Sequence, residues 1–230
     1  MAGHDIIVIG ASAGGVEAVS AVVRALPADL SAAVFVVVHF PPQSRSVLPQ
    51  ILARAGALPA AHAEDRETIR PGRIYVAPPG RHMLIEDGVV RLVRGARENG
   101  AIPAVDPLFR SAARSHRARV VGVVLSGNLA DGAAGLAAIK HHGGVAVVQD
   151  PAEALYNGMP RSAVENAPVD HVLPLHGIGP ALVRLARAPP ETRDITPDDD
   201  PVDERIEIEP DIPAVRATTA AGKGEARASA

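Results

Sequence analysis

Five short runs of apolar residues are spread over the first 150 positions of the chain, and none of them alternates regularly with polar residues. A strand that is covered on both faces has this pattern, because helices pack against both sides of a parallel sheet. The runs therefore predict buried strands at Ile6–Ile9, Val34–Val38, Ile74–Ala77, Val120–Leu125 and Val145–Val148.

Between these runs, apolar residues recur at helical spacing, which predicts helices over residues 14–25, 44–55, 105–115, 132–142 and 158–166. Strands that alternate with helices indicate an α/β fold. We expect a doubly wound, mostly parallel sheet with helices on both faces, a three-layer αβα arrangement of the Rossmann-like kind. Two further apolar runs flank Asp87-Gly88, a strong turn signal, and predict an antiparallel hairpin at one edge of the parallel core.

The composition changes near residue 188. Eleven acidic and five basic residues follow position 190, and prolines and alanines are frequent among them. Such a stretch buries too little apolar surface to offset the entropy lost on ordering. We expect one globular domain over residues 1–188 and an acidic, Pro/Ala-rich disordered tail over residues 189–230.

Composition also limits the function. Aromatic residues make up only 2% of the chain and the net charge is −3, which argues against binding of nucleic acid. The absence of cysteine excludes a thiol nucleophile and a cysteine-ligated metal. No apolar run approaches the roughly 20 residues needed to cross a bilayer, and we recognise no signal peptide. We expect a cytoplasmic monomer that does not insert into membranes.

The predicted first strand runs directly into a serine among glycines, where Gly10, Ser12 and Gly14 match G-x-S-x-G. Three interpretations remain open from these residues alone. The turn is a nucleophile elbow that exposes the serine hydroxyl, a dinucleotide-binding turn, or a turn that only reverses the chain. Ser12 stands where G-x-G-x-x-G needs its second glycine, which argues against the dinucleotide.

A serine nucleophile needs a base, and the base needs an orienting group. His39 directly follows one predicted strand, and Asp131 lies in a glycine-flanked loop after another. Functional groups gather at the carboxyl ends of parallel strands, so Ser12, His39 and Asp131 are candidates for one site. The alternatives are a histidine satisfied by the backbone and an aspartate that caps the helix it precedes. The other histidines match no zinc spacing, so we expect no metal.

Taken together, the motifs form an ordered series that spans most of the predicted globular part. The chain resembles the CheB-type catalytic domain of the chemotaxis receptor methylesterases over about residues 4–187. The stretches that carry the resemblance are IGASAGG (9–15), VVVHFPP (36–42), YVAPPGRHM (75–83), PAVDPLFRSAA (103–113), VVLSGNLADGAAGL (123–136) and GMPRSA (158–163).

The resemblance implies a serine hydrolase that cleaves methyl esters of glutamate side chains on chemoreceptors or other signalling proteins, without a cofactor; many members also deamidate glutamines. It implies that Ser12 is the nucleophile, that His39 is the base and that Asp131 orients His39. The oxyanion donors implied are the amides of Ala13 and of Asn128 or Leu129. Residues in family motifs that are candidates for substrate contacts are Arg81, His82 and Arg110.

The chain also departs from the family pattern. The domain begins within the first five residues, so we expect no receiver domain and no control by aspartyl phosphorylation within this chain. Ala13 replaces a small hydroxyl residue, and Gly127-Asn128-Leu129 stands where many members have Gly-Met-Gly. Three functions therefore stay open: a methylesterase, a non-catalytic interaction module that keeps the fold, and a nucleotide-binding domain.

Overall fold

The computed structural model describes residues 3–40 and 46–190, and within them the centre of the molecule is a parallel sheet of seven strands. All neighbouring strands of this sheet pair in parallel, in the order β3-β4-β2-β1-β7-β8-β9. The strands are β1 (Ile6–Ala11), β2 (Ala33–Val38), β3 (Ala60–His62), β4 (Ile74–Val76), β7 (Val120–Val124), β8 (Val145–Gln149) and β9 (His171–Leu173).

Both faces of the sheet are apolar and each has its own core. In β1, Ile7 and Ile9 belong to one core, whereas Ile6 and Val8 belong to the other. Side chains alternate between the faces of a strand, so a strand between two cores must be apolar at every position. The two cores therefore explain why the apolar runs do not alternate with polar residues. All five predicted strands are confirmed.

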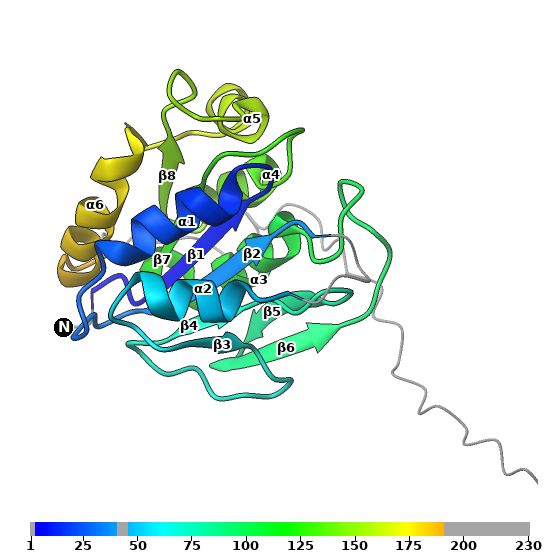
Figure 1. Cartoon of the computed structure of the whole chain (residues 1–230), viewed down its shortest axis with the longest axis vertical. Coiled ribbons are helices and arrows are strands. Elements are labelled where there is room, and N and C mark those ends of the chain that lie inside the picture. Colours follow the sequence, from blue (N-terminus) through cyan, green and yellow to red (C-terminus); the bar gives the residue numbers. More distant parts are fainter. Residues whose placement is uncertain (1–2, 41–45, 191–230) are drawn as a thin grey trace, which may run out of the picture.

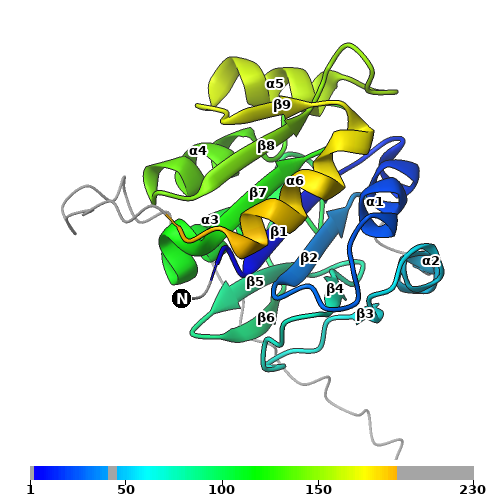
Figure 2. The same ribbon diagram turned by 90° about the vertical axis from the view of Figure 1, so that its left-hand side faces the viewer.

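In the described part of the chain, three helices pack on each face of the sheet, and Figures 1 and 2 show the sheet between these two layers. The first core is closed by α1 (Gly15–Arg24), α2 (Leu48–Ala55) and α6 (Leu175–Arg187). The second is closed by α3 (Val105–His116), α4 (Ala133–His141) and α5 (Gly158–Asn166), and a short 3-10 helix, Arg117–Arg119, follows α3. The doubly wound α/β architecture is therefore confirmed.

The predicted hairpin is present as β5 (His82–Glu86) and β6 (Val89–Val93), which pair in antiparallel fashion. Its strands form a sheet of their own rather than extending the main one. Met83 and Ile85 of β5 are buried in the same core as α3. The hairpin thus adds a wall beside α3 at the second face of the sheet.

Among the described residues, four elements were not predicted: β3, β9, α6 and the one-turn 3-10 helix after α3. The two strands have only three residues each and are partly exposed, so they leave no apolar run. The helix contains Gly177, Gly179 and Pro180, which are unfavourable inside helices and hide its periodicity. It is held by packing instead, since Ile178 and Leu182 are fully buried.

Several predictions fall outside the described residues. The acidic tail lies there from residue 191 onward, as do the Pro-Pro pair of the second motif and the first two residues of the helix predicted at 44–55. In the part of the chain that the structure describes, no helix is both long enough and apolar enough to cross a membrane.

Candidate active site

The candidate site is built where β1, β2 and β7 end. Parallel pairing aligns Ala11 of β1 with Val38 of β2, so Ser12 and His39 are the next positions on neighbouring strands. The His39 backbone N–H donates to the Ala11 carbonyl over 3.2 Å, and the Ser12 N–H donates to the Ser126 carbonyl beyond β7 over 3.0 Å. The carboxyl edge thus gathers three loops, as the sequence predicted.

The histidine and the aspartate are in direct contact. His39 Nε2 lies 2.7 Å from Asp131 Oδ2. The Asp131 side chain is 1% exposed, whereas the His39 side chain is 18% exposed. An acid at Nε2 holds the proton there and leaves Nδ1 as the basic nitrogen. Among the described residues the Ser12 hydroxyl makes no hydrogen bond, which is common before a substrate tightens a site.

Asp131 does not cap the helix that it precedes. Its carboxylate accepts the backbone N–H of Val105 over 2.7 Å and that of Asp106 over 3.0 Å, both in the first turn of α3. The start of α4 is bound instead by Asp106, which accepts from the N–H groups of Gly132 at 3.0 Å and Gly135 at 2.7 Å. Each acid therefore caps the other acid's helix.

The two acids titrate differently. Burial raises the pKa of Asp131, but the hydrogen bonds from His39 and from the Val105 and Asp106 amides outweigh it, so the pKa lies below its usual value. Burial and the neighbouring Asp131 charge raise the pKa of Asp106 to about 6. Asp131 thus stays ionised and can stabilise a protonated His39.

The loop after β7 lies directly against the serine. A Cβ on Gly127 would come within 2.8 Å of Ser12 Cβ and 2.2 Å of Met159 Sδ, so only glycine fits there. The next residues carry two of the predicted oxyanion amides, and Leu129 has a φ of +66°, which is strained for a leucine. Within residues 3–40 and 46–190, the N–H groups of Ala13, Asn128 and Leu129 donate to no other group.

Ser126 ties the serine turn to the loop before α5, a role that sequence reasoning missed. Its hydroxyl donates to the Ala13 carbonyl over 2.9 Å and accepts from the Tyr156 N–H over 3.0 Å. Its own N–H donates to the buried Gln149 side chain over 2.9 Å. Serine directly after a predicted strand was the available signal. This bracing fixes the turn that carries Ser12.

Several large apolar side chains near the carboxyl edge of the sheet are exposed to solvent. Leu129 and Leu155 are each 74% exposed, and Tyr156 is 43% exposed. Leu155 and Tyr156 both lie over the serine turn, since each would be within 3.3 Å of a Cβ on Gly14. Exposed apolar side chains around a site are typical of surfaces that bind another molecule.

The three candidate substrate contacts occupy different environments. His82 is 1% exposed, and its ring nitrogens lie 3.0 Å from the Ala96 carbonyl and 3.2 Å from the Ala104 N–H, so it braces the chain before α3. Arg110 forms a bidentate ion pair with Glu98, at 2.6 and 2.9 Å. Arg81 is half-buried, directly before β5. Their contacts with a substrate stay predictions.

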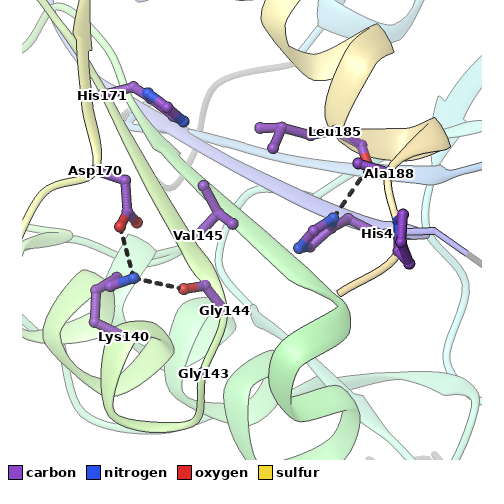
Figure 3. A pocket seen from close by; sticks show the side chains of 10 residues that line it. His4, Lys140, Gly143, Gly144, Val145, Asp170, His171, Leu185 and Ala188 are labelled. Atoms are coloured by element: carbon purple, nitrogen blue, oxygen red, sulfur yellow. Dashed lines mark hydrogen bonds and ion pairs between the residues drawn. The ribbon is translucent and has the colours of Figure 1, made fainter. Parts of the chain in front are cut away.

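A hollow lies at the opposite end of the sheet, where His4 precedes β1 and Val145 begins β8 (Figure 3). It measures about 410 Å³. Three of its titratable side chains are engaged: Lys140 binds Asp170 and the Gly144 carbonyl, and His4 Nδ1 lies 3.0 Å from the Leu185 carbonyl. No group of three or more side chains in the described ranges could hold a metal ion.

The chain is similar to known methylesterases over almost all of its described part. The family described as CheB methylesterase matches residues 7–182. A crystal structure of the CheB methylesterase catalytic domain from Thermotoga maritima superimposes with a TM-score of 0.75 at 32% identity. That match covers 79% of this chain and 98% of the Thermotoga domain.

Relatives by sequence differ in how much of their length matches. A protein of Leptospira interrogans is 40% identical over 183 residues, which cover 79% of this chain and 95% of the relative. A protein-glutamate methylesterase/protein-glutamine glutaminase of Anaeromyxobacter dehalogenans is 42% identical over 80% of this chain. The match covers only 54% of that relative, so the chain spans about half of its length.

Proposed function

The chain belongs to the CheB methylesterase family, and we propose that it hydrolyses methyl esters of glutamate side chains on a signalling protein, with glutamine deamidation as a second reaction at the same site. Relatives that carry both activities in their names support the reaction class. The observation that carries the proposal is the His39–Asp131 pair, 2.7 Å apart, beside Ser12 on the neighbouring strand end.

The first half of the reaction forms an acyl-enzyme. Ser12 Oγ attacks the ester carbonyl carbon while His39 Nδ1 takes the hydroxyl proton, and Asp131 stabilises the imidazolium through Nε2. The carbonyl electron pair moves to the oxygen, which accepts from the amides of Ala13 and of Asn128 or Leu129. The pair then returns, the C–O bond to the methoxy group breaks, and His39 delivers its proton to the leaving methanol.

The second half releases the product. Water takes the place of methanol and gives its proton to His39 as its oxygen attacks the acyl carbon. The bond to Ser12 Oγ breaks, His39 returns the proton to the serine, and the product leaves as a glutamic acid side chain, which loses its remaining proton to water and becomes the carboxylate. With a glutamine side chain the same steps release ammonia in place of methanol. No cofactor enters these steps, because His39 carries the proton that each half of the reaction transfers.

The substrate that fits this surface is a protein. The exposed Leu129, Leu155 and Tyr156 side chains offer apolar contacts next to the serine, and a small ester would leave most of that surface uncovered. Methylated receptor helices are the substrates that the family resemblance implies. The remaining alternative is a non-catalytic module that binds such a protein without turning it over.

The test is methanol release from a methylated receptor helix by the parent protein and by a Ser12→Ala variant. Release by the parent alone supports the proposal. Equal release by both proteins overturns the assignment of Ser12. If neither releases methanol, a serine-reactive phosphonate separates the remaining cases: labelling of Ser12 indicates an active site with another substrate, and no labelling favours the binding module.

A further inference from the structure

Asn99 lies between the two buried carboxylates of the site. Its Nδ2 is 2.9 Å from Asp131 Oδ1 and 2.8 Å from Asp106 Oδ2. Both acids already accept backbone N–H groups, and an ionised carboxylate can only accept. The amide must therefore turn its two N–H groups toward them, one to each acid.

The backbone around Asn99 is built to present this amide. Glu98 and Ala101 exchange two backbone hydrogen bonds, at 3.1 and 2.9 Å, around the two-residue turn Asn99-Gly100. Both turn residues have positive φ, +51° and +76°, as tight hairpin turns require. Asparagine tolerates this conformation better than other side-chain-bearing residues.

The turn is held onto α3 from outside. Arg110 of α3 binds both oxygens of Glu98, the residue before Asn99. His82 braces the same segment at Ala96 and at Ala104. Two candidate residues thus fix a turn whose tip reaches the carboxylates, although neither touches Asp131 in the hydrogen bonds described above.

We propose that Asn99 is a positioning residue of the catalytic apparatus, which fixes the carboxylate of Asp131 against His39 by bridging it to Asp106. The inference deepens the proposed function and rests on it. Asp131 uses four hydrogen bonds, from His39, Val105, Asp106 and Asn99, and only the last comes from a side chain that also holds the second acid.

The bridge also has an electrostatic role. Asp106 and Asp131 repel each other, and the hydrogen bond from Asn99 is one of the contacts that lower the pKa of Asp106 against burial and that repulsion. The other charged groups of the cluster are His39, paired with Asp131, and Arg110, which lowers the pKa of Asp106 as well. Loss of the Asn99 amide therefore favours protonation of Asp106 or Asp131, and it weakens the hydrogen bond that holds His39 against Asp131.

The test compares two changes at one position with a control on the same turn. Asn99→Gly keeps the positive φ and deletes the amide, whereas Asn99→Asp keeps the size and replaces the donors with a third carboxylate. Arg97→Ala is the control, because Arg97 is exposed and its side chain binds, among residues 3–40 and 46–190, only the Gly100 carbonyl of the turn, over 3.2 Å.

In methanol release, we expect both Asn99 variants to lose about ten-fold or more in kcat with KM within about two-fold, because the amide N–H groups are bound to the two carboxylates rather than left for a substrate. We expect the acid limb of the pH–rate profile to move to higher pH, since protonation of the acid pair becomes easier. Arg97→Ala should match the parent. Asn99 variants that match the parent in kcat and in pH profile would overturn the proposal.

A readout without turnover separates this inference from the proposed function. The His39 Nε2 proton, held by Asp131, should give a low-field proton resonance in the parent and in Arg97→Ala. We expect the resonance to be lost or moved upfield in Asn99→Gly. An unchanged resonance in that variant overturns the positioning role even if the parent releases no methanol, whereas an inactive parent with the expected resonance change contradicts only the reaction.

Discussion

Asp131 accepts hydrogen bonds from the first turn of α3, the helix that contains Asp106. Asp106 in turn accepts hydrogen bonds from the start of α4, the helix that follows Asp131. A helix N-terminus has free N–H groups and a partial positive charge, so it stabilises a carboxylate placed against it. Two helix starts therefore compensate two acids that are 4% and 1% exposed. This exchange explains how Asp131 keeps its charge beside a second acid and remains available to His39.

A change at Asp106 tests this balance through stability. Its pKa of about 6 in the folded protein exceeds the ordinary value of 3.8, so the native state holds this proton more tightly than the unfolded chain. The resulting stabilisation is complete below about pH 4 and is lost as pH rises through 6, by about 3 kcal/mol at most at ~1.4 kcal/mol per pKa unit. Asp106→Asn cannot ionise and lacks this dependence.

We therefore expect the unfolding free energy of the parent, minus that of Asp106→Asn, to fall between pH 4 and pH 7. Urea denaturation at several pH values measures it. Asp131, whose pKa is shifted the opposite way, is present in both proteins, so its contribution largely cancels. A difference that stays constant over this range would show that Asp106 does not titrate as described.

At the scale of elements, α3 and α4 can exchange caps only because they approach closely. Gly135 of α4 lies against α3, where a Cβ would be 2.4 Å from Phe109 Cβ and 3.0 Å from Asp106 Oδ1. Gly10 of β1 gives the same access beneath Val105 at the start of α3. Small residues on a strand and a helix thus bring two helix starts to the edge where Ser12 and His39 lie.

Two glycine-to-alanine changes within helices distinguish the effect of close packing between α3 and α4 from the effect of helix propensity. Gly135→Ala should destabilise the protein by about 1–3 kcal/mol through overpacking, and it should lower methanol release because it pushes α3 away from Asp131. Gly177→Ala in α6 has its nearest neighbour at 3.6 Å, so we expect a gain of about 0.5–1 kcal/mol and unchanged release. Equal effects of the two changes on melting temperature would contradict the packing argument.

The elements that the sequence predicted are those whose pattern follows from burial alone. The strands between two cores must be apolar throughout, and the helices beside them must have one apolar face. The pattern of α6 was not recognised, because tertiary packing, with Gly179 close to Ala25 at the end of α1, overrides its unfavourable glycines and proline. The pairs of β3 and β9 with their neighbours are too short to leave a signal.

At the scale of the whole molecule, topology explains which site residues sequence reasoning could reach. Ser12, His39 and Asp131 follow separate strands, and the ends of neighbouring parallel strands meet at one edge by construction. The sequence did not point to Asn99 or Asp106. Asn99 lies in the turn between Glu98 and Ala101, Asp106 lies in the first turn of α3, and the two meet only through the tertiary packing of α3. The Asn99-Gly100 pair was a visible turn signal, but nothing local connects it with Asp131.

We expect the independent folding unit to end at or before residue 190. Described residues up to 186 build both cores, and α6 closes the first core with Ile178 and Leu182. We propose that a protein ending at residue 190 folds alone, because the removed segment is rich in charge and proline and contributes little apolar surface. Its melting temperature and its methanol release should match those of the full chain. A melting temperature lower by several degrees would mean that residues 191–230 stabilise the domain, and a change in release alone would mean that they act at the site.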